Sequence, residues 1–427
     1  MKKNLIIAIL LLSSIVTFAQ KINFNEYFLS KTLRFDYIHA GNNSSEFIYL
    51  EQFKEEPYWG GSQTNTIDPF NYGEFRLMVY DLATNKLIYS QSYATLFQEW
   101  QATEEAQKIN RSFYESVNIP YPKNPVKIVI EKRDMKNNFK SLFEIDFDEN
   151  NFFVKKEKVY DFKTSRILDN GDPSKNVDIV IIPEGYTETE MDKFKADAQR
   201  FSDAIFKYSP FDKYKNKFNI HIIEAYSKES GTDIPGKNIW KNTIVNSTFY
   251  TFGIERYITT PDVKAVRDVA SLVPYDQIYI LVNSSKYGGG GIYNFYNLCV
   301  ADNFSSELIF VHEFGHGFGG LADEYWTSDV AVQDYYDLSV EPADPNITTL
   351  VDFESKWKHM VDKNTPIPTP SNSGKYRDKV GAFEGGGYVE KGIYRPSYNC
   401  YMKALDADNF CPVCQDALEK MIKFYTE

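Results

Sequence analysis

The sequence predicts an α+β protein, in which an antiparallel β-sandwich is followed by an α/β domain. The first observation is a change of pattern: apolar and polar residues alternate as far as about residue 163, and continuous apolar runs separated by helical patterns follow. The second is composition: 43% of the residues are apolar, which is enough to form hydrophobic cores, and 16% are aromatic, which favours strands. The third is the length of 427 residues, which favours two or three domains.

The N-terminus has the features of a secretory signal peptide over residues 1–19. A short positive region, Lys2-Lys3, precedes an apolar run at residues 5–16, and a small-residue cleavage site ends at Ala19. The run is shorter than the about 18 apolar residues that a membrane helix needs, and no other stretch approaches that length. We therefore expect cleavage near Ala19, a secreted or periplasmic protein, and no stable membrane insertion.

The negative net charge argues against nucleic acid as a partner. The formal net charge is −12, and such an acidic surface repels nucleic acid and anionic membranes. No basic patch overturns this, so we expect no nucleic-acid partner. Oligomeric state is left undetermined.

The first domain, residues 20–165, is expected to be the β-sandwich. Residues 73–97 predict two strands around a turn at 83–86, and residues 126–148 repeat this form around Asn137-Asn138. We expect no catalytic cluster there. His39 stands alone and is expected to be a surface or packed histidine.

The second domain, residues 166–427, begins within a polar segment at 161–176 that we interpret as the linker. A continuous apolar strand, VDIVIIPEGY, follows, and then a helix that opens with a capping box of Thr187 and Glu190. His221 lies within another apolar strand and is expected to be a core histidine. Further strands and an intervening helix are predicted at residues 218–223, 277–282 and 261–273.

The stretch SSELIFVHEFGHGFGGLADEY, residues 305–325, contains two of the five histidines. On a helix His312 and His316 are one turn plus about 40° apart, so their imidazoles project from one face, as two ligands of one Zn²⁺ require. Glu313 is displaced by about 100° and can reach a metal-bound water without being a ligand. The metal lowers the pKa of that water and the carboxylate takes its proton, so the pattern predicts a hydrolase with Glu313 as catalytic base. Glycines crowd the end of this helix, and Asp323 and Glu324 follow as oxygen donors.

HEFGHGFGGLADEY, followed far downstream by RPSYNCYMKALDADNFCPVC, resembles the immunoglobulin A metallopeptidase family, a metzincin-like group of zinc endopeptidases. VDIVIIPEGYT and the β-rich region before it resemble that family too, so the resemblance covers most of the mature chain. It implies a metzincin-like α/β zinc peptidase domain that hydrolyses peptide bonds by a zinc-bound water. Protein or peptide substrates follow, with immunoglobulin or another host glycoprotein as a candidate.

The resemblance also assigns residues. His312 and His316 match the two zinc-binding histidines, Glu313 matches the catalytic glutamate, and Met402 resembles the residue of the Met-turn beneath the metal. Gly319 matches the glycine at which such chains turn to deliver the third ligand.

The third ligand departs from the usual metzincin pattern. The expected histidine position, ten residues after the first histidine, holds Ala322, which cannot bind metal. Some metzincin relatives use aspartate, so we expect Asp323 as the third Zn²⁺ ligand and Glu324 as its rival. The residue that does not bind is expected to accept a hydrogen bond from a ligand histidine. A gluzincin-like alternative would recruit Glu341 or Glu354, but the glycine turn and Met402 argue against it. His359 is the other possible donor.

Two further features bear on substrate binding. The glycine-rich segment at 286–302 predicts a strand whose backbone an extended peptide can approach and pair with. Tyr398 or Tyr401 is a candidate for stabilising the oxyanion of the tetrahedral intermediate.

The four cysteines are Cys299, Cys400, Cys411 and Cys414. In an exported protein disulfides are the first expectation, and we favour a structural bridge from Cys400 to Cys411 or Cys414. The CPVC motif could instead be redox-active or half of a second zinc site, for which the sequence has no second pair at zinc spacing.

Two functional classes remain. The first is an active zinc endopeptidase, and the second is a catalytically inactive peptidase-fold protein that binds extracellular polypeptides. An intact H-E-x-x-H, which a binding protein has no physical reason to keep, favours the enzyme.

Overall fold

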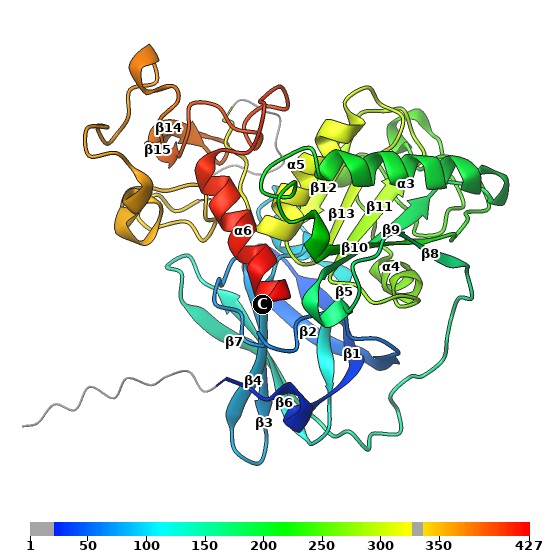
Figure 1. The fold of residues 1–427 in the computed structure, drawn as a ribbon. Helices are drawn as coiled ribbons and strands as arrows, with labels where there is room; N and C mark the ends of the chain where they lie inside the picture. Colours follow the sequence, from blue (N-terminus) through cyan, green and yellow to red (C-terminus); the bar gives the residue numbers. More distant parts are fainter. Residues whose placement is uncertain (1–20, 327–335) are drawn as a thin grey trace, which may run out of the picture.

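The computed structural model of the protein describes residues 21–326 and 336–427 (Figure 1). The predicted signal peptide at 1–19 lies outside the described residues. Among the residues that are described, no helix combines the length and the apolar character needed to cross a membrane.

The N-terminal half consists of two antiparallel sheets. The first has the order β2-β1-β5, with β1 at Phe28–Gly41, β2 at Glu46–Glu56 and β5 at Arg111–Pro122. The second has the order β4-β3-β6-β7, with β3 at Phe75–Asp81, β4 at Lys86–Tyr93, β6 at Val126–Arg133 and β7 at Phe139–Phe147. Two short helices accompany them, α1 at Phe24–Tyr27 and α2 at Leu96–Gln101. The alternation of apolar residues gives each sheet a buried face, and the two faces share one core that includes Phe35, Leu77 and Ile128.

The C-terminal half is built on a six-stranded sheet with the order β12-β13-β11-β9-β10-β8. The four central strands are parallel, and the edge strands β8 and β12 are antiparallel to their neighbours. The strands are β8 Thr164–Leu168, β9 Val177–Glu184, β10 Phe218–Ile223, β11 Gln277–Val282, β12 Gly289–Ile292 and β13 Tyr296–Val300. The helices are α3 Met191–Ile205, α4 Val263–Ala270, α5 Ser306–Gly319 and α6 Pro412–Thr426, and a separate hairpin joins β14 Phe383–Gly386 to β15 Val389–Arg395. Short 3₁₀ turns lie at Pro173–Lys175, Glu188–Glu190, Lys215–Lys217, Pro235–Lys237, Thr251–Gly253, Phe353–Ser355, Lys358–Met360 and Gly374–Tyr376.

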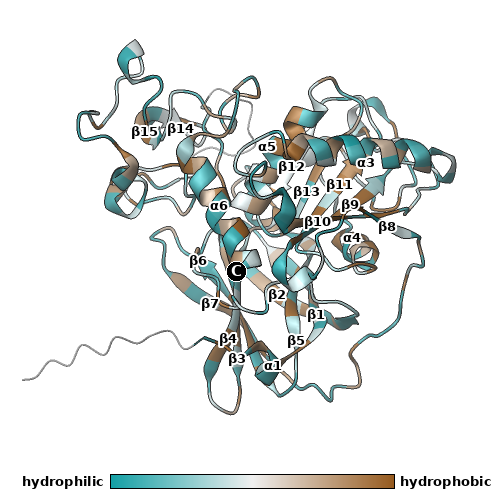
Figure 2. Ribbon diagram, viewed as in Figure 1, coloured by the Kyte–Doolittle hydropathy of each residue, from teal (hydrophilic) through white to brown (hydrophobic). Residues whose placement is uncertain are grey.

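Helices cover both faces of this sheet, which explains the continuous apolar runs. Successive residues of β9 point to opposite layers: Ile179 and Ile181 join the core beneath α3 and α5, whereas Val180 and Ile182 join the core beneath α4. Figure 2 shows the resulting contrast between the mostly apolar strands β9 to β11 and the mixed surface of α3.

The structure confirms the predicted α+β class. It differs from the sequence prediction in the segment expected to be a linker, part of which is a strand. Within 161–176, residues Thr164–Leu168 form β8 and pair with β10 at the edge of the second sheet. The predicted boundary between residues 165 and 166 therefore falls inside a strand, and the boundary itself stays a prediction.

The two halves are joined by a buried ionic network. Asp268 of α4 lies 2.9 Å from Arg34 of β1 and 2.7 Å from Lys54 of β2, measured between charged atoms. Arg34 also pairs with Asp36 and Glu56, at 2.9 and 3.0 Å. All these side chains are at most 5% exposed, so their charges depend on one another for compensation.

Candidate metal centre and active site

Helix α5 carries the predicted histidines and ends in a turn that brings the chain back beneath them. Gly320 has a φ of +60°, and its N–H donates to the carbonyl of His316 at 2.9 Å, while Leu321 N–H donates to Gly315 at 3.2 Å. A left-handed residue that closes the last helical turn in this way is most often glycine. The turn places the carbonyl of Leu321 2.6 Å from His316 Nδ1.

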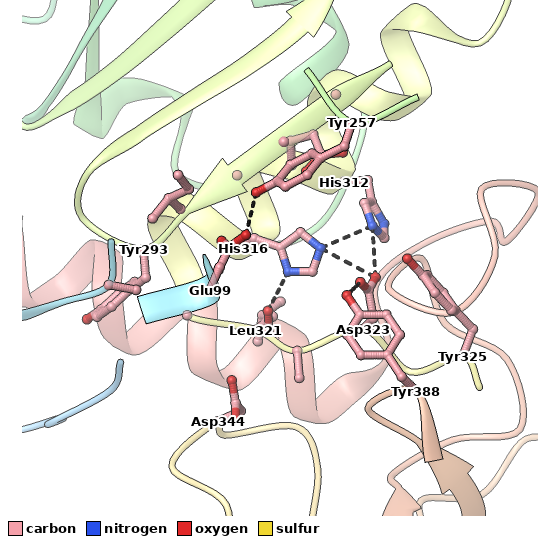
Figure 3. A pocket seen from close by; sticks show the side chains of 18 of the residues that line it. Glu99, Tyr257, Tyr293, His312, His316, Leu321, Asp323, Tyr325, Asp344 and Tyr388 are labelled. Carbon is pink, nitrogen blue, oxygen red and sulfur yellow. Dashed lines mark hydrogen bonds and ion pairs between the residues drawn. The ribbon is translucent and has the colours of Figure 1, made fainter. Parts of the chain in front are cut away.

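Three side-chain atoms converge at this turn (Figure 3). The Nε2 atoms of His312 and His316 are 3.2 Å apart, and Asp323 Oδ1 lies 3.1 and 3.4 Å from them, respectively. The Nδ1 atoms face backbone carbonyls, Tyr401 for His312 at 3.2 Å and Leu321 for His316 at 2.6 Å. Because a carbonyl only accepts, each Nδ1 carries a proton, so Nε2 is the ring atom that faces the shared point and is available to a metal ion.

This donor set fits a divalent metal ion. Two imidazole lone pairs and a carboxylate oxygen repel one another unless a cation or a proton lies between them, and two histidines with one acid form a common catalytic zinc set. Burial lowers the pKa of His316, but the Asp323 carboxylate outweighs this and raises that pKa to about 9. The negative charge that holds this proton also attracts a metal ion, which competes for the same lone pair.

Asp323 is fixed from its far side. Tyr388, in the turn between β14 and β15, donates its hydroxyl hydrogen to Asp323 Oδ2, which leaves Oδ1 directed at the histidines (Figure 3). Burial opposes ionisation of Asp323, yet the two imidazoles hold the pKa of this carboxyl well below its usual value. Asp323 is therefore an ionised, oriented carboxylate.

Glu313 lies beside this group without belonging to it. Ligand atoms of His312, His316 and Asp323 are all within 4.8 Å of one another, and Glu313 is not part of that described set. Its carboxylate lies against β12, because a Cβ built on Gly289 would come within 2.7 Å of Glu313 Oε1. Burial raises the pKa of Glu313, although the neighbouring histidines act against this rise. A carboxylate in that position can exchange protons with a molecule bound at the centre.

The centre opens into a cavity of about 660 Å³. Its lining includes the backbone of Gly289–Gly291 in β12 and the rings of Tyr257, Tyr287, Tyr325 and Tyr388. The outer edge of β12 is not wholly free, since Gly289 forms a β-bridge with Tyr257.

The N-terminal half contributes to this cavity, which sequence reasoning missed. Glu99 of α2 lines the cavity and accepts a hydrogen bond of 2.6 Å from the hydroxyl of Tyr257. Burial raises the pKa of Glu99 to about 7. A single acid on a short helix of a β-rich region gives no signal in the sequence, and the expectation of no catalytic cluster in this half did not consider one lone acid that reaches the other half's cavity.

The other candidates lie elsewhere. Glu324 turns away from the histidines: its Oε1 accepts from Asn346 Nδ2 and from the Cys414 thiol, each at 3.1 Å. The expectation that it accepts from a ligand histidine is wrong, since backbone carbonyls take that role. Glu341, Glu354 and His359 do not join the described ligand group.

The two tyrosines suggested for the oxyanion also lie outside the cavity lining. Tyr401 is fully buried and donates to the carbonyl of Leu308 at 3.1 Å, whereas Tyr398 contacts Arg377. The isolated histidines are packed as expected: His39 lies between Glu115 and Glu46, and His221 contacts Asp178 at 2.9 Å.

The turn at residues 400–402 supports α5 from below. Met402 is fully buried against the helix, since a Cβ on Gly315 would meet its sulfur at 2.7 Å. Its carbonyl accepts from the N–H of Glu324 at 2.9 Å, and the preceding carbonyl, that of Tyr401, holds His312. All four cysteines are present as thiols, so the favoured disulfide is not formed in the structure, although Cys400, Cys411 and Cys414 do lie together.

Comparison with known families agrees with this geometry. A family model described as IgA Peptidase M64 matches residues 166–379 and 371–422. A second, described as Peptidase M64 N-terminus, matches residues 23–144. No curated protein matches the chain.

Proposed function

Since the chain belongs to the IgA peptidase M64 family, a family of metallopeptidases, we propose that it is a zinc-dependent endopeptidase with its active site at His312, Glu313, His316 and Asp323. The observation that carries the proposal is the convergence of two imidazole Nε2 atoms and Asp323 Oδ1 within 3.1–3.4 Å. Three ligands of this kind leave one position of a tetrahedral Zn²⁺ site for a water molecule or a substrate.

The protein residues have separate tasks in this scheme. Zn²⁺ held by His312, His316 and Asp323 would supply Lewis-acid polarisation of the scissile carbonyl and would lower the pKa of a water molecule at the site. Glu313 takes the proton of the attacking water and returns a proton to the leaving amine. Tyr388 keeps the Asp323 carboxylate oriented, and the carbonyls of Tyr401 and Leu321 keep each imidazole in the tautomer that exposes Nε2. Met402 is proposed as the counterpart of the metzincin Met-turn residue.

Substrates are proposed to be extended polypeptides. The glycines of β12 line the cavity beside Glu313, and a backbone without side chains lets a peptide strand approach closely. Immunoglobulin is a candidate substrate because of the family description, and other host glycoproteins are proposed as alternatives. We further propose that residues 1–19 are removed on export, so that the N-terminal residue of the mature secreted or periplasmic protein lies near Gln20.

The test compares wild type with Glu313→Gln on a mixed protein substrate, with zinc measured in both. We expect Glu313→Gln to keep its zinc and to lose about 10²- to 10⁴-fold in kcat/KM, because the general base is removed while the ligands remain. Glu307→Gln is the matched control, since Glu307 lies on the same helix but outside the cavity lining.

Two results would count against the proposal. Equal cleavage by wild type and Glu313→Gln would remove Glu313 from the reaction. If the wild-type protein bound no zinc and cleaved no substrate, the alternative would be supported. That alternative is an inactive protein that binds extracellular polypeptides.

A further inference from the structure

A second group of metal-binding side chains lies behind the first. Glu324, Cys400, Cys411 and Cys414 are all buried, and one ligand atom of each lies within 4.8 Å of the others. Cys400 Sγ is 3.7 Å from Cys414 Sγ, and Cys414 Sγ is 3.1 Å from Glu324 Oε1. The proposed peptidase reaction uses none of these four side chains.

We propose that Glu324, Cys400, Cys411 and Cys414 bind a second divalent metal ion, Zn²⁺, in a closed structural site. Thiolates favour zinc among the common divalent ions, and structural zinc sites have four protein ligands with no open position.

The distances agree with a tetrahedral site. Zn–S bonds of about 2.3 Å at tetrahedral angles separate two sulfurs by about 3.8 Å, and the separation of Cys400 and Cys414 is 3.7 Å. A disulfide would need the sulfurs at about 2.05 Å and would leave the third thiol unpaired beside a buried carboxylate.

The surroundings of Cys411 favour a deprotonated thiol, and positive charge also lies near Cys400 and Glu324. Cys411 is the N-cap of α6, a helix of 15 residues, so its sulfur lies at the positive end of the helix dipole. The N–H of Cys411 donates to Cys400 Sγ at 3.2 Å. The buried guanidinium of Arg395 adds positive charge that acts on both Glu324 and Cys400.

One oxygen of the Glu324 carboxylate is available as a metal ligand. Glu324 is fully buried, and its Oε2 has no hydrogen-bond partner among the described residues. A buried ionised carboxylate is costly without a counter-charge, and a metal ion supplies one.

Burial also separates this site from a redox motif. CPVC at a helix N-terminus resembles a dithiol oxidoreductase, but such a motif needs an exposed sulfur for a partner to attack. Cys411 is 4% exposed, and Cys400 and Cys414 are fully buried.

The position of the second ion gives it a role at the first centre. Its ligands come from three segments: the loop that carries Asp323, the turn at 400–402 whose Tyr401 carbonyl holds His312, and the start of α6. The Glu324 N–H already bonds the Met402 carbonyl at 2.9 Å. A metal ion would link these three segments through their side chains. It would thereby stabilise the loop that carries Asp323 and the turn whose carbonyl contacts His312.

The first experiment counts metal in the purified full chain. We expect two zinc ions per wild-type chain, one in Cys414→Ala, and one in Asp323→Ala. Cys299→Ala is the control and should keep two, because Cys299 is a buried thiol outside the cluster. Equal zinc content in wild type and Cys414→Ala would overturn the proposal, whether or not the first centre holds its own ion.

A second experiment does not depend on a variant that folds. Wild type reconstituted with Co²⁺ should show intense thiolate-to-cobalt charge-transfer absorption, and Asp323→Ala should show the same bands because its thiol site is intact. Alkylation after denaturation in chelator without reductant should modify all four cysteines. No charge-transfer band, or only two modified cysteines, would overturn the second site, and a disulfide would then be the correct assignment. Failure of the peptidase proposal leaves these readouts unchanged, since they require no cleavage.

Discussion

At the residue scale, the proposed metal centre depends on the contacts that orient the Asp323 carboxylate. Tyr388 holds Oδ2 of this carboxylate, and no bond of its own joins Tyr388 to the histidines. The hydroxyl therefore orients a ligand without being one, and its loss should weaken metal binding while the ligands remain.

We predict that Tyr388→Phe lowers zinc affinity about 10- to 100-fold, as is usual when a partner of a metal ligand is removed. Competition with a chromophoric chelator measures this affinity. Tyr398→Phe is the control, since its hydroxyl contacts Arg377 and lies outside the cavity lining. An unchanged affinity in Tyr388→Phe would show that the contact does not orient Asp323.

Sequence reasoning reached part of this centre. The spacing of His312 and His316 identifies a shared helix face, because helical geometry alone brings residues four apart together. The prediction of Asp323 as third ligand required the resemblance to a known family as well as the glycine turn. Tyr388, Tyr257 and Glu99 were not foreseen, because they arrive from remote segments whose approach is set by tertiary packing.

At the scale of elements, the position of α5 depends on its close approach to β13. A Cβ added at Gly317 would lie 1.9 Å from Asn297 Oδ1, and Asn297 is fully buried in β13. The helix can therefore lie this close to the sheet only with glycine at that position.

We predict that Gly317→Ala destabilises the protein by about 1–3 kcal/mol, because the buried amide cannot move away without cost. It should also reduce peptidase activity, since Gly317 directly follows His316. Chemical denaturation measures the stability. Gly374→Ala is a matched control, because no atom lies within 4 Å of a Cβ built there. Equal stability of Gly317→Ala and wild type would mean that Asn297 and β13 can move away from the added methyl group at little cost.

A second prediction concerns the first sheet, where His39 of β1 lies between Glu115 of β5 and Glu46 of β2. Its Nδ1 is 2.9 Å from Glu115 and its Nε2 is 3.3 Å from Glu46, while Lys132 pairs with Glu46 from the other sheet. Burial lowers the pKa of His39, but the two carboxylates outweigh this and raise it. A pKa raised in the folded state stabilises the protein fully below the unfolded value of about 6.5, and this contribution is lost as pH rises through the folded value.

The free-energy difference of unfolding between wild type and His39→Gln should therefore be larger at about pH 6 than at about pH 9. Urea titrations at both pH values measure it. His359→Gln, at an exposed position, should show no such trend. A difference that grows with pH would mean that His39 is held neutral in the fold.

The predicted elements were found where periodicity was strong and missed where it was weak. Continuous apolar strands such as β9 follow directly from two covered faces. β8 was read as linker because its five residues are exposed or half-buried at a sheet edge, and only pairing with β10 makes it a strand. The short hairpin of β14 and β15 has no alternation long enough to detect.

At the scale of the whole molecule, one carboxylate links the two halves. Asp268 compensates Arg34 and Lys54, which come from the N-terminal sheet and are at most 4% exposed. No periodic pattern relates residues more than 200 positions apart, so the sequence did not predict this junction.

We predict that Asp268→Ala costs about 3–5 kcal/mol of unfolding free energy, because it removes the carboxylate that pairs with the buried Lys54 and one of the three carboxylates that pair with the buried Arg34. Calorimetry should show both halves destabilised together in one transition. Asp192→Ala removes an exposed pair with Lys195 and should change stability little. Destabilisation of the N-terminal half alone would show that the halves fold independently.

Helix α2 of the N-terminal half lines part of the cavity through Glu99, and this has a practical consequence. A truncated protein that starts at residue 166 would retain every proposed zinc ligand yet lack the residues of α2 that line one side of the cavity. Compounds that contact Glu99 in the intact protein would lose that contact in such a fragment, so inhibitor screens require both halves of the chain.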